Sequence, residues 1–136
     1  MSNITQVVNV DKNLKTIKKG VHASDMDQVL SSTGPYTFFA PTDLAFEKLD
    51  KGFMETMLEP AHRTELANLI KNHLISGRIN FNELKDGDKL VTVNKMELLV
   101  TIKEGVVNIG NATIIARDAK ISNGIIHLTD TVLQKN

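Results

Sequence analysis

The sequence predicts an α+β fold, and three observations lead to that prediction. Apolar residues recur at helical spacing through much of the first half of the chain. Short β-forming runs separated by turn residues fill the second half, from about residue 89. One aromatic run, at residues 36–40, leads directly into a helix signal. Helices that precede a series of strands are typical of the α+β class.

Residues 36–46 form the joint around which we expect the rest of the chain to assemble. The segment begins with Tyr-Thr-Phe-Phe-Ala, a pattern that predicts a buried strand. Pro41 has no amide hydrogen for a β-ladder and should end that strand. Thr42 or Asp43 then supplies a helix N-cap worth about 1 kcal/mol, and Phe46 lies on the helix that follows.

The first 34 residues are predicted to form three short helices. Asp11 is expected to cap the second helix and Ser24 the third. Gly20 should weaken the second helix by about 1 kcal/mol relative to alanine. The water-facing side of that helix carries three lysines, Lys15, Lys18 and Lys19. The apolar positions of the three helices are Ile4, Val7, Val8, Leu14, Ile17, Val21, Met26, Val29 and Leu30.

Three further helical segments are expected before the strands. The helix after Pro41 should end near Gly52, and a short apolar helical turn follows it. Pro60 suits the first position of the next helix, where its missing amide is harmless. Gly77 is expected to be the left-handed cap at the end of that helix. The short turn carries Phe53, Met54, Met57 and Leu58, and the long helix has an apolar stripe of Leu66, Leu69, Ile70, His73 and Leu74.

The strands of the second half follow one another through tight turns. Residues 90–93 and 98–102 should form a hairpin around Asn94-Lys95. Further strands are expected at residues 106–109, 112–116 and 125–129. Asn123-Gly124 is a strong turn signal before the last of these. This spacing predicts a mostly antiparallel sheet system within a single domain, residues 1–136.

Composition excludes several classes of function. Sixteen basic and sixteen acidic residues cancel, so no overall field attracts nucleic acid. The chain has no cysteine, which excludes disulfides and thiolate ligands. It has no apolar run of membrane-spanning length. The first eight residues lack the basic and apolar regions of a signal peptide, which fits either a protein that stays in the cell or a mature fragment with an added methionine.

Three segments of the chain resemble the fasciclin domain family. Residues 36–46, with Phe39-Ala40-Pro41-Thr42 followed by Asp43 and Phe46, resemble its first signature segment. Residues 72–77 resemble its central Tyr-His segment. Residues 112–133 resemble its second signature segment through Asp118, Asn123-Gly124, His127 and Asp130. The three segments occur in the family's order and span nearly the whole chain.

The resemblance implies a wedge of two packed, mostly antiparallel β-sheets, a β-sandwich flanked by helices from the N-terminal half. It implies a secreted or surface-attached, non-enzymatic module for cell adhesion, with a matrix or cell-surface protein or polysaccharide as partner. It implies no cofactor, although a few family members carry carotenoids. The chain departs from the family pattern at Asn72, where the family has Tyr, and it has no Arg-Gly-Asp triplet or convincing Asp-Ile segment, which argues against integrin contact.

His73 and His127 are the strongest candidates for a metal or acid-base site. A zinc site needs more ligands than these two, and the spacing of His22 and His62 supplies none. A histidine on an apolar face more often hydrogen-bonds a backbone group inside the core. We therefore expect both histidines to be structural and no metal to be bound.

Three aspartates lie at segment boundaries, and two of them could form a catalytic pair of general acid and general base. They are Asp43, Asp118 and Asp130. Aspartate at such boundaries usually caps helices or closes turns. No nucleophile elbow, phosphate loop or metal motif accompanies them, so we expect no catalysis.

Two groups of side chains could meet a partner. Lys15, Lys18 and Lys19 are either a solvated helix face or a contact for a polyanion such as a glycosaminoglycan. Phe53, Met54 and Met57 are either core or a patch that adapts to a partner, because methionine fits irregular surfaces.

The leading interpretation is a non-catalytic extracellular binding module, a monomer with no nucleic-acid partner. The alternative is a carrier of a small apolar ligand, such as a carotenoid, near Phe53 and Met57. A hidden hydrolase ranks last. The family resemblance favours the cell surface, and the absence of a signal peptide in this chain leaves the cytoplasm open.

Overall fold

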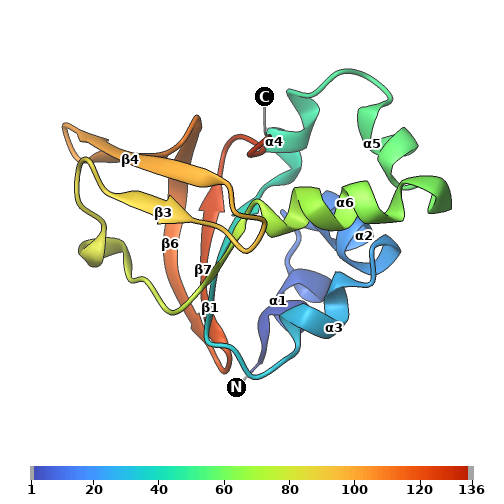
Figure 1. Ribbon diagram of the computed structural model, residues 1–136, viewed down its shortest axis with the longest axis horizontal. Helices are drawn as coiled ribbons and strands as arrows, with labels where there is room; N and C mark the ends of the chain where they lie inside the picture. Colours follow the sequence, from blue (N-terminus) through green and yellow to red (C-terminus); the bar gives the residue numbers. More distant parts are fainter. Residues whose placement is uncertain (1, 135–136) are drawn as a thin grey trace.

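The computed structural model describes residues 2–134, apart from the side chain of Asp118. It confirms the α+β class, with the helices gathered on one side of a sheet (Figure 1). The helices are α1 (Ile4–Val10), α2 (Lys15–Ala23), α3 (Met26–Leu30), α4 (Asp43–Glu47), α5 (Phe53–Met57) and α6 (Arg63–Lys71), with 3₁₀ turns η1 (Pro60–His62) and η2 (Phe81–Glu83). The strands are β1 (Tyr36–Pro41), β2 (Leu74–Ser76), β3 (Lys89–Val91), β4 (Glu97–Lys103), β5 (Val106–Ile109), β6 (Ala112–Ile121) and β7 (Gly124–Thr129).

The strands lie in the order β2-β1-β7-β6-β5-β4-β3. Within residues 2–134, β1 and β7 are the one parallel pair, with Phe38 opposite Ile126, and the other paired strands are antiparallel. The prediction of a mostly antiparallel system is therefore confirmed. The parallel pair joins the two signature segments, which are about 90 residues apart in sequence, side by side next to the edge strand β2.

The two packed sheets expected from the resemblance are two halves of one bent sheet. Strand β6 pairs with β5 near its start and with β7 along the rest of its length, and register shifts at Ala116 accompany the change. Such bulges bend a strand and increase its twist. The Val93 amide donates to the Leu74 carbonyl at 2.8 Å, so the chain just beyond β3 meets β2 and the two sheet edges come together.

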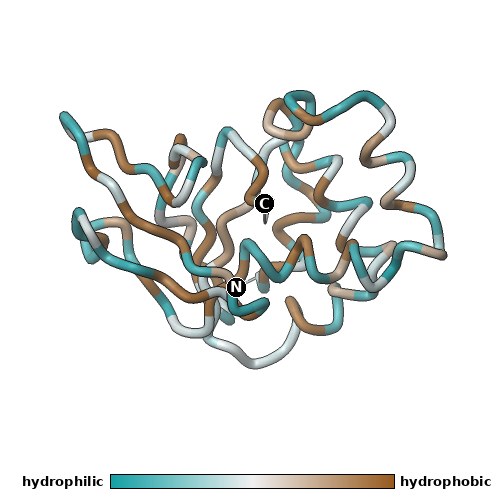
Figure 2. The backbone as a smooth tube through the Cα atoms, turned by 45° about the horizontal axis from the view of Figure 1, so that its top comes forward, coloured by the Kyte–Doolittle hydropathy of each residue, from teal (hydrophilic) through white to brown (hydrophobic). Residues whose placement is uncertain are grey.

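Side chains of β1 alternate between two cores, as the pleat of a strand requires. Phe38 and Ala40 face the helices in a cluster with Ile17, Val21, Leu66 and Ile70. Phe39 faces the other way, into a cluster between the sheet halves with Val100, Ile109 and Leu133. In Figure 2 the tube alternates between brown and teal along the helices and outer strands, as expected for elements with one buried face.

Three local predictions are wrong. The helix that starts after Pro60 ends at Lys71, and residues 74–76 form β2; Gly77 follows a strand, and its amide donates to the Pro35 carbonyl. Asp11 does not cap α2, because its carboxylate accepts from the Asn13 amide. Ser24 does not cap α3: it ends α2, and its hydroxyl donates to the Gly20 carbonyl at 2.7 Å.

Gly20 has a packing role besides its helix cost. It is buried, and an added Cβ would lie 3.6 Å from Ile70 Cδ1 and 3.6 Å from Leu66 Cδ1. Helices α2 and α6 therefore approach closely at this point, with room for a methyl group at ordinary contact distance.

None of the helices within residues 2–134 has the length and apolar run needed to cross a lipid bilayer.

Candidate functional site

The first signature segment holds three parts of the fold together. In β1, Phe39 and Ala40 are fully buried and Pro41 pairs with Thr129. Thr42 caps α4 by accepting from the Ala45 amide at 3.4 Å. Asp43 acts at a distance in sequence: its Oδ1 accepts from the Thr16 amide at 2.8 Å, in the first turn of α2. This carboxylate supplies the cap that local sequence reasoning assigned to Asp11. Phe46 is 7% exposed and belongs to the helix-side core.

His73 is buried, with both ring nitrogens in hydrogen bonds. Its Nε2 accepts from the Leu133 amide at 2.8 Å. An amide only donates, so the ring proton lies on Nδ1, which donates to the Leu69 carbonyl at 2.8 Å. Burial lowers the pKa of His73 to about 4, against the opposite effect of the bond to Leu69. The ring is neutral and ties the C-terminal segment to the end of α6.

Asn72, where the family has tyrosine, holds the same segment. Its Nδ2 donates to the Leu133 carbonyl at 3.3 Å, and its Oδ1 accepts from Asn94 Nδ2 at 2.7 Å. Asn72 and His73 thus hold the carbonyl and the amide of one residue, Leu133.

Asn123 connects three elements through one buried side chain. Its Nδ2 donates to the carbonyls of Leu30 and Ser32, each at 2.8 Å, and its Oδ1 accepts from the Ile4 amide at 3.0 Å. Its backbone carbonyl also accepts from the Tyr36 amide. The start of α1, the end of α3 and the start of β1 therefore meet at this residue.

Gly124 is required for a reason other than the predicted turn. The hairpin loop is Ser122-Asn123, and Gly124 is already in β7, paired with Ile121 and with Tyr36 of β1. A Cβ at Gly124 would lie 2.0 Å from the Tyr36 carbonyl oxygen. Close approach of two backbones, and not a left-handed conformation, calls for glycine here.

His127 is fully buried on β7. Its Nε2 lies 2.9 Å from the Ile79 carbonyl oxygen, and its ring stacks on Phe39 with centroids 5.6 Å apart. His127 lies opposite Phe39 in the β1–β7 register and His73 follows α6, and each histidine bonds a different set of backbone groups. Within residues 2–134 no group of three or more potential ligands forms a metal site.

The aspartates do not form an acid-base pair in the part of the chain that is described. Asp43 caps α2, whereas Asp130 closes the β6–β7 end: its Oδ1 accepts from the Thr113 amide at 2.9 Å and its Oδ2 lies 3.8 Å from Lys48 Nζ. Asp118 lies on β6, and its side chain is outside the described part of the structure.

A basic groove lined by four lysines is one of the concave surfaces of the molecule. It has a volume of about 650 Å³ and lies between the end of α1 and the exposed face of α2. All three lysines singled out from the sequence line it. The sequence alone did not assign three further members to this surface: Val10 comes from α1, Lys12 from the α1–α2 connection, and His22 from the last turn of α2. We define the basic groove by Val10, Lys12, Lys15, Lys18, Lys19 and His22.

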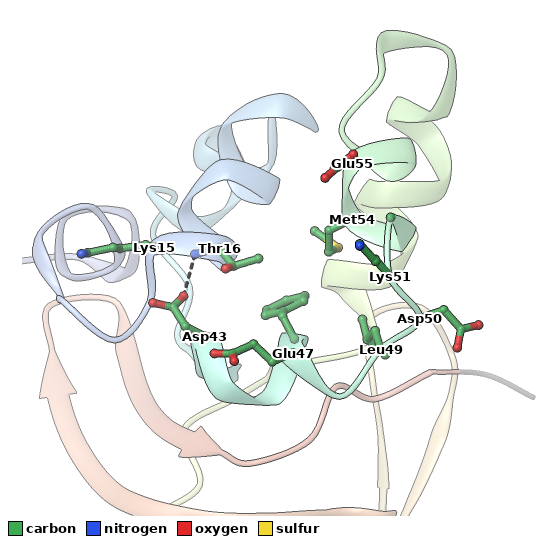
Figure 3. Close-up of a pocket in the computed structure, with 11 residues that line it drawn as sticks. Lys15, Thr16, Asp43, Glu47, Leu49, Asp50, Lys51, Met54 and Glu55 are labelled. Carbon is green, nitrogen blue, oxygen red and sulfur yellow. Dashed lines mark hydrogen bonds between the residues drawn. The ribbon is translucent and has the colours of Figure 1, made fainter.

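A second groove, of about 610 Å³, lies on the other side of Lys15 (Figure 3). Its walls come from α2, α4 and α5, and its charged residues are mainly acidic. Asp43, which accepts from the Thr16 amide, and Glu47 both lie on α4, and Asp50 follows that helix. Met54 lines this groove beside Glu55. Lys15 therefore lies between a mainly basic groove and a mainly acidic one.

Phe53 and Met57 line two adjoining grooves of about 470 and 410 Å³ along α5 and α6. Met57 is 9% exposed and belongs to the helix-side core, against which Phe53 and Met54 pack. The larger groove also has polar walls from Glu65, Asn68, Asn72, Asn94 and Gln134. A long apolar ligand would displace water from these polar side chains without offering them hydrogen bonds in return, so the groove suits a polar ligand better than a carotenoid.

Comparison with known proteins decides the family. The family profile described as Fasciclin domain matches residues 12–135. The chain belongs to the fasciclin domain family. Two relatives come from the cyanobacterium Synechocystis: protein sll1483 is 32% identical over 96% of this chain and 72% of its own length, and protein sll1735 is 35% identical over 98% of both.

Animal relatives of this fasciclin domain are larger proteins. Transforming growth factor-beta-induced protein ig-h3 of Sus scrofa is 28% identical over 97% of this chain, and human periostin is 30% identical over 87% of it. The chain spans only 19% and 14% of their lengths. The structure also matches a FAS1 domain pair from the insect cell adhesion molecule fasciclin I, with a TM-score of 0.85 at 17% identity, covering 98% of this chain and 51% of that one.

The family sets the general class of function. Fasciclin domains are linked to cell adhesion in eukaryotic homologues, which are extracellular or surface proteins. They are generally non-enzymatic modules that bind matrix or cell-surface proteins.

Proposed function

We propose that this fasciclin domain is a non-catalytic binding module that works outside the cell, where it contacts a matrix or cell-surface protein or polysaccharide. The observation on which this rests most is the similarity to ig-h3 and periostin, which covers 97% and 87% of this chain. The internal contacts support it, since the motif side chains His73, Asn123 and Asp43 are already bonded to backbone groups of the domain itself. Recognition therefore falls to exposed surfaces and grooves.

Shape and charge complementarity are the mechanism of this proposal. The motif residues fix the relative positions of α1, α2, α3 and β1, and so hold the grooves between these elements in one geometry. A preformed surface costs less conformational entropy on binding than one that must be ordered.

Retention on immobilised extracellular matrix tests the proposal. The folded chain is applied at physiological salt and 37 °C, with the Gly124→Ala chain, whose added Cβ would clash with the Tyr36 backbone, as the unfolded control for nonspecific adsorption. Retention of the folded chain alone is the expected result. Equal retention of both samples, or of neither, would contradict an adhesion function, and turnover in a broad hydrolase substrate panel would contradict the non-catalytic part.

A further inference from the structure

We propose that the basic groove binds an acidic polysaccharide, a linear sugar polymer with sulfate or carboxylate groups along its length. This inference deepens the proposed function and rests on it, because it names the partner class and the surface. The formal net charge of the chain is zero, but its positive charge is not evenly spread. Four of its sixteen lysines and arginines line this one groove.

The groove lysines are exposed and have no carboxylate partner among the described residues. Ion pairs elsewhere occupy Lys48 with Asp130 and Arg63 with Asp25. Among the described residues, His22 is the one member of the groove within ion-pair distance of an acid, with its Nδ1 3.7 Å from an Asp27 carboxylate oxygen. The one acid lining the groove, Asp11, already accepts from the Asn13 amide. Four ammonium groups are therefore available to an external anion.

The arrangement of these charges is a row. Lys15, Lys19 and His22 are spaced by four and three residues on α2, and seven residues of α-helix cover about 10 Å. Lys12 extends the row beyond the start of the helix, and Lys18 widens it. A row of point charges on flexible stems matches a polymer that repeats an anionic group, whereas a single phosphate would use only part of it.

The remaining lining favours sugar over the other polyanions. Within residues 2–134 no Phe, Tyr or Trp lines the groove, and its one ring is the imidazole of His22, so the row of stacked bases by which single-stranded nucleic acid binds has no matching series of aromatic platforms there. Val10 is 84% exposed, and it offers one apolar contact beside the alkyl stems of the lysines. One valine is far less than the apolar face by which an amphipathic helix enters a bilayer.

Heparin chromatography with the full chain tests this assignment. A quadruple variant, Lys12→Ala with Lys15→Ala, Lys18→Ala and Lys19→Ala, is compared with a control that removes four exposed lysines elsewhere: Lys85→Ala, Lys89→Ala, Lys103→Ala and Lys120→Ala. Both variants change net charge equally. We expect the control to elute near the wild-type salt concentration and the groove variant to bind heparin decasaccharide at least about tenfold more weakly, with a shallower salt dependence.

A second set, with arginine at all four groove positions, separates charge from folding. Arginine keeps the charge, so this set should retain binding. Equal losses in the groove and control variants would overturn the assignment, as would tighter binding of anionic vesicles, of an acidic peptide or of single-stranded DNA than of heparin. Matrix retention without heparin binding would overturn this inference alone; loss of both would also remove the proposed function.

Discussion

Replacement of His73 by alanine should change how stability depends on pH, and not only its level. At pH 7.5 the substitution leaves the Leu133 amide and the Leu69 carbonyl without their partner. Stranding buried groups and removing the ring should lower the free energy of unfolding by about 2 kcal/mol. Acid should then reduce the difference between the two proteins.

The sign follows from the protonation states. The folded-state pKa of His73 is about 4, below the ordinary histidine value of 6.5. Between these values the unfolded chain binds a proton that the folded chain does not, so the stability contributed by neutral His73 is complete above about pH 6.5 and is lost as the pH falls. With these two pKa values, linkage removes about 2 kcal/mol by pH 5 and about 3 kcal/mol by pH 4.

Urea denaturation followed by circular dichroism measures the effect at pH 7.5, 6, 5 and 4. The gap between wild type and His73→Ala should shrink from about 2 kcal/mol at pH 7.5 to about zero at pH 5. The difference cancels the titration of the carboxylates, which both proteins share. Asn72→Ala is the matched control, since it loses a bond to the same residue, Leu133, but has no titrating group.

Two results would refute this reasoning. A constant gap between wild type and His73→Ala from pH 7.5 to 4 would mean that the ring is not held neutral in the folded protein. A gap for Asn72→Ala that shrinks in the same way would mean that acid releases the Leu133 segment by another route.

Three further predictions concern the same framework. Asn123→Ala should lower the free energy of unfolding by about 3 kcal/mol, and Asn123→Asp by at least as much, because a carboxylate would face two carbonyls; a urea midpoint within error of wild type would be contrary to this. Gly124→Ala should prevent folding at 37 °C, since its Cβ would meet the Tyr36 backbone, whereas Gly20→Ala should raise the free energy of unfolding by up to about 1 kcal/mol. A thermal melt in which Gly124→Ala is as stable as wild type, or Gly20→Ala is less stable, would contradict this. Asp43→Ala should cost about 1 kcal/mol by uncapping α2, and hydrogen exchange at the Thr16 amide that is no faster than in wild type would count against it.

The strands were predictable because their information is local. Alternating residues and Gly- or Asn-containing turns placed β3, β4, β5 and β7 within two residues of their observed bounds, whereas β6 continues to Ile121, well beyond the predicted end at residue 116. The end of α6 was not predictable in this way. Residues 72–74 continue the helical spacing of α6, but the strand pairing of Leu74 with Phe38 of β1 takes precedence, and that partner is 36 residues away.

The helix caps and the groove were predictable only where their contacts are local in sequence. Asp11 is the nearest acid to α2 in sequence, yet Asp43 caps that helix from 27 residues further on. The lysine face of α2 could be read from helical spacing, but the groove also needs Val10 from α1. The position of α1 relative to α2 leaves no pattern in the local sequence, and neither do the contacts by which Asn123 holds α1 and α3.

The central claim is that the signature residues build the framework and that recognition lies on the α1–α2 surface. Titration of the ¹⁵N-labelled chain with heparin decasaccharide, followed by amide chemical shifts, tests it directly. We expect the chemical-shift changes to be concentrated in residues 9–22 and the amide shifts of His73, Asn123 and His127 to stay unchanged. Shifts centred on those three residues, with residues 9–22 unaffected, would contradict it.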